Sequence, residues 1–162
     1  MVKLISCRVN SNLPVQILGQ NSDSRSRFAT SQRNYCVFDE TEVNFWLRGR
    51  EHSLPFLNSI LKKSDDEYEL TKVLYILNRM LDDGVTGIDG MYPTLSRFNN
   101  TQSPNIQTFL AGIYRKTQIP DAFGPLVKML IQNSLKVNSK QNFDPNEEIG
   151  GAILSYIYNR KS

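Results

Sequence analysis

Cysteine and histidine are scarce in this 162-residue chain, and their scarcity excludes most metal and nucleophile chemistry. The only histidine is His52, and the two cysteines, Cys7 and Cys36, lie in the N-terminal stretch. Two thiols and one imidazole fall short of the four ligands of a structural zinc site. We therefore expect no metal and no cofactor. Reduced thiols are the simpler interpretation of the cysteines, and a disulfide between them stays open as the alternative.

Long apolar runs and alternating strand patterns are also missing. The longest apolar runs, such as "ILSYIY" at 153–158, are far shorter than the roughly 20 residues of a membrane-spanning helix. The N-terminus lacks the apolar segment and small-residue cleavage site of a signal peptide, so we expect a cytoplasmic protein with no membrane span. A hydrophobic content of 40% and a charged content of 22% are typical of one globular domain.

An excess of one charge occurs only near the N-terminus. Residues 1–38 hold five basic side chains against Asp23 alone, whereas the remaining residues hold 14 basic and 15 acidic side chains. Residues 1–40 are also rich in Ser, Asn, Gln and Arg, which predicts a mostly irregular extension ahead of a folded domain at 41–162. The basic extension makes association with nucleic acid or an anionic surface an alternative function.

Helical periodicity dominates from residue 42 onward, which predicts an all-α domain. The clearest helix covers 66–82, where apolar residues recur at three- and four-residue steps. Ser64 and Glu67 match a capping box before this helix, and Gly84 follows its end, where a left-handed residue is favoured. The other predicted helices cover 42–47, 52–63, 87–98, 105–116, 120–135 and 146–159.

One phrase occurs three times within these helices. "DGMYPTLSRF" starts at Asp89 and "DAFGPLVKML" starts 32 residues later, and "EHSLPFLNSI" from Glu51 follows the same pattern. Each copy has an acid, a proline at +4 and apolar residues at +6 and +9. Proline is tolerated at a helix start because the first N–H groups have no intrahelical partner. Repeated helix pairs of roughly 30 to 40 residues are typical of an α-solenoid, and three unrelated proline-initiated helices are the alternative.

The segment "PTLSRFNNTQSPNIQTFLAGI" resembles a HEAT repeat, with a proline-containing first helix, a polar turn and an apolar second helix that includes Ala111. "PLVKMLIQNSL" with "DPNEEIGGAILSYI" is similar, so the resemblance covers 51–159. It implies a short right-handed α-solenoid of antiparallel helix pairs, as in HEAT and armadillo proteins. Gln107 and Gly150 stand where the family commonly has a basic residue, so an irregular helical bundle stays open.

No group of residues indicates catalysis, so we expect a non-enzymatic interaction or scaffolding module. Its partner would be an unknown protein or another copy of the chain. The expected binding residues lie opposite the apolar stripes: Tyr68, Lys72, Tyr75 and Arg79 on the 66–82 helix, and Tyr114 and Arg115, with Gln107, on the 105–116 helix. Tyrosine and arginine are enriched at protein interfaces. An enzyme with an unrecognised site is the third hypothesis.

Overall fold

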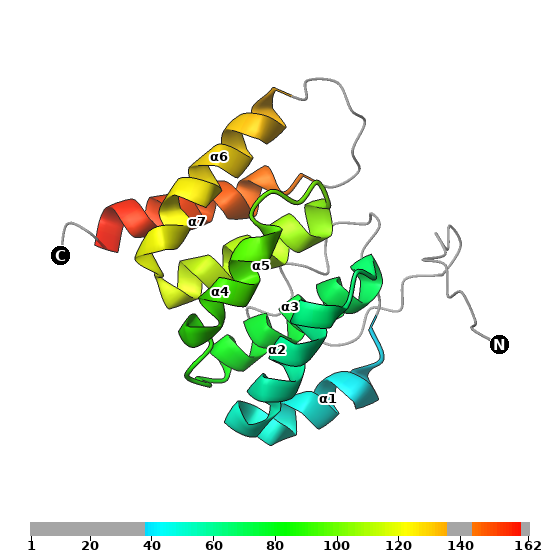
Figure 1. Cartoon of the computed structure of the whole chain (residues 1–162). Helices are drawn as coiled ribbons and strands as arrows, with labels where there is room; N and C mark the ends of the chain where they lie inside the picture. The colour runs from blue at the N-terminus through cyan, green and yellow to red at the C-terminus, as the bar shows by residue number, and fades with distance from the viewer. Residues whose placement is uncertain (1–37, 136–143, 160–162) are drawn as a thin grey trace, which may run out of the picture. The chain divides into compact units, whose positions relative to one another are not determined.

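The computed structural model describes residues 38–135 and 144–159, and within them only helices, turns and irregular segments occur. The prediction of an all-α domain is therefore confirmed for this part of the chain. The expected irregular extension lies outside it up to residue 37, as do Cys7 and Cys36. The α-helices are α1 (Glu40–Gly49), α2 (Leu54–Lys63), α3 (Glu67–Asp82), α4 (Tyr92–Leu95), α5 (Pro104–Thr117), α6 (Phe123–Ser134) and α7 (Asn146–Asn159) (Figure 1). The 3-10 helices are η2 (Arg50–Ser53), η3 (Asp89–Met91), η4 (Ser96–Phe98) and η5 (Pro120–Ala122).

Short polar side chains start several helices by accepting hydrogen bonds from the free N–H groups of the first turn. The Asp39 carboxylate accepts from the Thr41 amide at 2.7 Å, and the Asp66 carboxylate accepts from the Glu69 amide at 2.7 Å. The predicted capping box of Ser64 and Glu67 is therefore wrong, because α3 begins one residue after Asp66. Ser64 instead ends α2, and its Oγ accepts from the Asp66 amide at 3.2 Å.

The end of α3 matches its prediction closely. The Val85 amide donates to the Met80 carbonyl at 2.8 Å, and the Gly84 amide donates to the Leu81 carbonyl at 3.1 Å. This pair of bonds is the Schellman motif, which requires a left-handed residue just past the helix. Gly84 has φ +74°, so glycine supplies that conformation without a steric penalty.

The three copies of the repeated phrase share one local structure. In each copy the acid lies in a 3-10 turn, and the proline lies in the first turn of the α-helix that follows. The missing proline N–H therefore costs no intrahelical hydrogen bond. The prolines start their helices and do not kink them further along. The acid–proline pairs are Glu51 with Pro55, Asp89 with Pro93, and Asp121 with Pro125.

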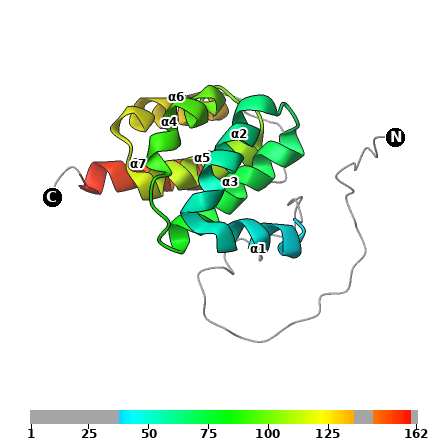
Figure 2. The ribbon, with the colours of Figure 1, turned by 60° about the horizontal axis from the view of Figure 1, so that its bottom comes forward.

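The helices lie in two layers. In Figure 2, α2, α4 and α6 lie along the upper side and α3, α5 and α7 along the lower side. Helix α5 packs between α3 and α7, and α2 packs against α3 and α4. Ser103 Oγ bonds Glu67 Oε1 at the N-terminal ends of α5 and α3, and Lys116 Nζ lies 2.8 Å from Asp82 Oδ1 at their C-terminal ends. Helices α3 and α5 are therefore parallel.

The last two helices run in opposite directions. The Phe123 ring at the start of α6 lies 5.8 Å from the Tyr156 ring near the end of α7. At the other end, Asn133 Nδ2 donates to Asn146 Oδ1 at 3.1 Å. The Tyr156 hydroxyl also donates to the Ile119 carbonyl, just after α5, at 2.7 Å. This side chain therefore joins α7 to the end of α5.

The core lies between the two layers, and the apolar stripe predicted on α3 faces it. Leu74 and Leu77 are fully buried in the middle of this stripe. The other predicted members are Leu70, Val73 and Met80, which are buried, and Leu81, which is half-buried. Helix α1 packs on a further side of α3, so α3 is buried more completely than a helix with one apolar face.

Candidate functional site

Four of the six predicted binding residues lie together on α3, as their helical spacing requires. The Arg79 guanidinium is 5.7 Å from the Tyr75 ring centre and donates to the Tyr75 hydroxyl at 3.2 Å. Two turns before, the Lys72 ammonium is 5.7 Å from the Tyr68 ring centre. The set therefore forms two cation–aromatic pairs. We call the surface made by Tyr68, Lys72, Tyr75 and Arg79 the α3 face.

This face is covered by the chain's own α1, which corrects the prediction that it is open to a partner. The Phe38 ring, just before α1, lies 5.5 Å from the Tyr68 ring and 5.1 Å from the Tyr75 ring. Two carboxylates of α1 pair with the two cations: Glu42 with Lys72 at 2.6 Å, and Glu40 with Arg79 at 3.3 Å. The four side chains are consequently half-buried.

Burial, hydrogen bonding and nearby charges on this face together determine the pKa of Arg79. Burial alone would lower its pKa, because a buried cation loses hydration. The hydrogen bond to Tyr75 and the charges of Tyr75 and Glu40 act in the opposite direction, and the pKa of Arg79 is raised overall. Arg79 is therefore a permanent cation at the centre of the α3 face.

The prediction that Tyr114 and Gln107 lie on an exposed face of α5 is wrong. Tyr114 is fully buried, and its hydroxyl donates to Asn99 Oδ1 at 2.8 Å. Burial also raises its pKa. Gln107 is buried as well, and its Nε2 donates to the Thr101 carbonyl at 2.8 Å. The reason is that α5 lies between α3 and α7 and is also contacted by η4, so even its polar side faces protein.

Arg115 is half-exposed but does not extend the α3 face. Its guanidinium pairs with Glu148 of α7 at 3.0 Å. Burial raises the pKa of Glu148 above its ordinary value, although Arg115 and Lys116 oppose that shift. Phe109 lies beside Tyr75 instead, with the two ring centres 5.7 Å apart and the rings nearly perpendicular. Sequence reasoning missed Phe109 because it was counted with the apolar stripe of its helix.

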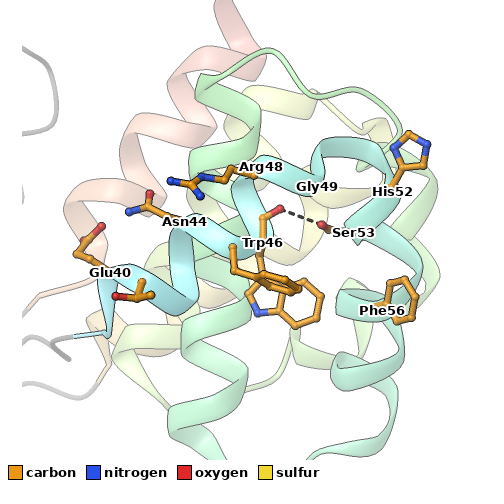
Figure 3. A pocket seen from close by; sticks show the side chains of 10 residues that line it. Glu40, Asn44, Trp46, Arg48, Gly49, His52, Ser53 and Phe56 are labelled. Atoms are coloured by element: carbon orange, nitrogen blue, oxygen red, sulfur yellow. Dashed lines mark hydrogen bonds between the residues drawn. The ribbon is translucent and has the colours of Figure 1, made fainter.

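A second surface, on α1, η2 and α2, was not anticipated. Figure 3 shows Trp46 in the middle of a hollow, with Glu40 and Asn44 toward one end and His52 and Phe56 toward the other. The hollow has a volume of about 730 Å³. Ser53 helps to shape it, because its Oγ donates to the Trp46 carbonyl at 2.8 Å and ties α1 to η2.

Three aromatic side chains dominate this surface, which we call the aromatic hollow. The Phe45 ring lies edge-on to Trp46, with ring centres 5.2 Å apart, and Phe56 follows with its ring centre 6.5 Å from that of Trp46. Phe45 is 68% exposed and Phe56 is 63% exposed, so both rings face solvent. A sequence signal for them existed, because each phenylalanine falls off the apolar stripe of its own helix.

The described residues can also be compared with the requirements of a metal site and of a membrane span. They contain no group of three or more His, Cys, Asp and Glu side chains that could hold a metal ion. His52 is exposed at the edge of the aromatic hollow. None of the described helices combines the length and the apolar character that crossing a membrane requires.

No protein-family model, curated protein or solved structure matches this chain. Its function must therefore be argued from the geometry of its own surfaces.

Proposed function

We propose that this chain is a non-enzymatic protein-binding module, built as a short right-handed α-solenoid of HEAT-like helix pairs. Three features support the architecture. The proline phrase has the same local structure in all three copies, α3 and α5 run parallel as successive second helices do in a solenoid, and α6 and α7 run antiparallel as a helix pair does. In such a stack each unit contacts its neighbours and leaves extended surfaces for partners.

The aromatic hollow is the main support for a protein-binding function. Large apolar side chains on a surface are normal when scattered, but a contiguous group marks an interaction site. Here two phenylalanines that are more than 60% exposed flank the only tryptophan of the chain. Their combined surface would be removed from water by a bound protein, which is the main favourable contribution to association.

The surroundings of the hollow fit a protein partner. Its aromatic centre is edged by Glu40, Arg48 and His52, which gives the apolar core and polar rim of a protein interface. Trp46 and Phe56 also line a second hollow of about 440 Å³, with Ile60 and Lys63. The same rings can therefore be contacted from two sides. The partner chemistry that fits is an aliphatic or aromatic side chain inserted between Phe45 and Phe56, with polar groups at the margin.

The test compares partner recovery by three forms of the tagged full-length chain. The Phe45→Ser, Phe56→Ser variant removes the two exposed rings, and both positions are exposed enough for the fold to persist. We expect the recovered partner to fall by about 30-fold or more, because a lost interface anchor costs about 2 kcal/mol or more.

The control is the Leu135→Ser, Leu154→Ser variant, which removes exposed apolar area just after α6 and on α7 instead; Leu135 is 78% exposed and Leu154 is 54% exposed. It should recover the partner as the unaltered chain does. Equal recovery by all three forms would contradict the assignment of the hollow. Recovery that depends on nuclease-sensitive material would favour the basic extension and nucleic acid.

A further inference from the structure

The α3 face is complete without α1. The Lys72–Tyr68 and Arg79–Tyr75 pairs are contacts within α3, and the edge-on contact of Tyr75 with Phe109 is made by α5. None of these contacts involves α1. The face therefore has two cations about two turns apart on one helix, separated by an aromatic ring, and each cation keeps a ring contact of its own besides its ion pair with α1.

Phe38 and α1, which cover the α3 face, are held there mainly by ion pairs and by contacts between aromatic rings. Val43 is the only buried residue of α1, and Phe38 just before it is the other buried apolar group. The two ion pairs use carboxylates that are 65% exposed at Glu40 and 45% exposed at Glu42. The cations are less exposed, at 15% for Lys72 and 24% for Arg79, but the solvent at the carboxylates lets salt weaken both pairs. Few apolar contacts therefore oppose removal of the segment.

The connection between α1 and η2 also favours release. Arg50 ends α1 with φ +47° and ψ −132°, which is a sparsely populated region for a residue other than glycine. Such a conformation persists only while surrounding contacts enforce it. When α1 leaves the α3 face, Arg50 is free to relax, and a turn at this junction also breaks the hydrogen bond from Ser53 Oγ to the Trp46 carbonyl. With that bond broken, the junction can act as the hinge.

We propose that the α3 face is a docking site for a helical segment of a partner protein, and that residues 38–43 are an internal occupant which this segment replaces. The internal occupant defines the chemistry of the partner. It has an aromatic residue, Phe38, a helix cap, Asp39, and acidic residues at Glu40 and Glu42 in the first helical turn. A partner segment of the same kind places its ring between Tyr68 and Tyr75 and its carboxylates on Lys72 and Arg79.

This site is distinct from the aromatic hollow, so the inference does not depend on the function proposed for the hollow. The two surfaces are nevertheless coupled through α1. Phe45 and Trp46 lie on α1, so release of α1 from α3 also dismantles the hollow. A partner on the α3 face and a partner in the hollow therefore exclude each other.

The test uses charge reversal on both sides of the contact. The probes are two fluorescein-labelled peptides of residues 37–48, one with the natural sequence and one carrying Glu40→Lys and Glu42→Lys. The receptors are the full chain, its Glu40→Lys, Glu42→Lys variant and its Lys72→Glu, Arg79→Glu variant. Each variant breaks the internal ion pairs; the first leaves the α3 face positive, and the second makes it negative. Circular dichroism checks that both variants keep their helices.

The expected result is a crossed pattern of fluorescence anisotropy. The natural peptide should bind the Glu40→Lys, Glu42→Lys chain about 10-fold or more tighter than the unaltered chain, because the internal competitor is weakened. The reversed peptide should bind only the Lys72→Glu, Arg79→Glu chain. A Lys63→Glu change added to the first variant is the control, since this exposed lysine lies on α2, and it should leave binding unchanged. One peptide binding both variants equally, or no binding by either variant, would overturn the proposal.

Trp46 gives an independent signal because it is the only tryptophan in the chain. A natural-sequence peptide with Trp46→Phe, added to the full chain, should shift the Trp46 emission to the red as α1 moves into solvent. Sedimentation of the full chain alone identifies the competing occupant. A monomer is expected; a dimer that disappears in the Glu40→Lys, Glu42→Lys variant would assign the face to a second copy and overturn the choice of a foreign segment.

Discussion

Gly112 of α5 lies close against Asn78 of α3, and this contact allows a sharp test of how these helices pack. A Cβ atom added at Gly112 would lie 2.6 Å from Asn78 Oδ1, closer than unstrained side chains come. Asn78 is buried, and its Nδ2 donates to the Phe109 carbonyl at 2.6 Å. Its Oδ1 also accepts from Lys116 Nζ at 3.3 Å. The Gly112→Ala change therefore forces Asn78 to move and disrupts these bonds.

Two opposing effects set the change in the free energy of unfolding that Gly112→Ala causes. Alanine in a helix interior is favoured over glycine by about 1 kcal/mol. Loss of the buried Asn78 hydrogen bond costs about 1–3 kcal/mol. We therefore expect Gly112→Ala to change the free energy of unfolding by between zero and about 2 kcal/mol, in the destabilising direction. The matched control is Gly150→Ala on α7, where nothing lies within 4 Å of the added Cβ, and it should stabilise by about 0.5–1 kcal/mol.

Urea unfolding followed by circular dichroism measures both changes. The difference between the two variants, about 1–3 kcal/mol, isolates the contact from helix propensity. The Asn78→Ala, Gly112→Ala double change supplies a further check, because removal of the Asn78 side chain makes room for the Cβ and the two single effects should not add. Equal stabilisation by Gly112→Ala and Gly150→Ala would refute the close packing of α3 on α5.

Two further substitutions test the burial of the core and the dependence of stability on pH. Leu77→Ala should cost about 2–5 kcal/mol, because Leu77 is fully buried, whereas Leu135→Ala, at a position 78% exposed, should change the free energy of unfolding by less than about 0.5 kcal/mol. Tyr156→Phe should cost about 1–3 kcal/mol at neutral pH, because its hydroxyl donates to the Tyr114 and Ile119 carbonyls. Burial raises the pKa of Tyr156 from 10.0 to about 12, so the folded chain keeps a proton that the unfolded chain loses. Stability should therefore fall as the pH rises from 10 toward 12, and chemical unfolding across that range should show a shallower fall in the phenylalanine variant.

The helices were predictable because their signals are local. Apolar spacing, the glycine after α3 and the prolines in first turns depend on neighbouring residues alone, and the structure has each of them. The Ser64 cap failed for an equally local reason. Asp66, two residues later, accepts from the Glu69 amide at the position where the helix begins, and sequence spacing does not decide between two cap candidates this close together.

The burial of α5 was not predictable from its own pattern. A stripe of apolar residues predicts one buried face, and the polar residues Gln107 and Tyr114 were assigned to the opposite side. A central helix is covered on several sides, so its polar side chains are buried and must find partners within the protein. Gln107 exchanges hydrogen bonds with Asn133, and Tyr114 bonds Asn99. Those partners lie 26 and 15 residues away in the sequence, beyond the reach of helical spacing.

The boundary between the extension and the helical domain was also not predictable from local sequence. Composition places the boundary at residue 40, where the polar, arginine-rich stretch ends. Three residues of that stretch nevertheless serve the helical body: Asp39 caps α1, Phe38 fills the space between Tyr68 and Tyr75, and Glu40 pairs with Arg79. A chain begun at residue 41 would lack the cap, the ring and the Glu40 carboxylate that pairs with Arg79. The residues that decide whether α1 stays on the α3 face are therefore the ones that composition assigns to the extension.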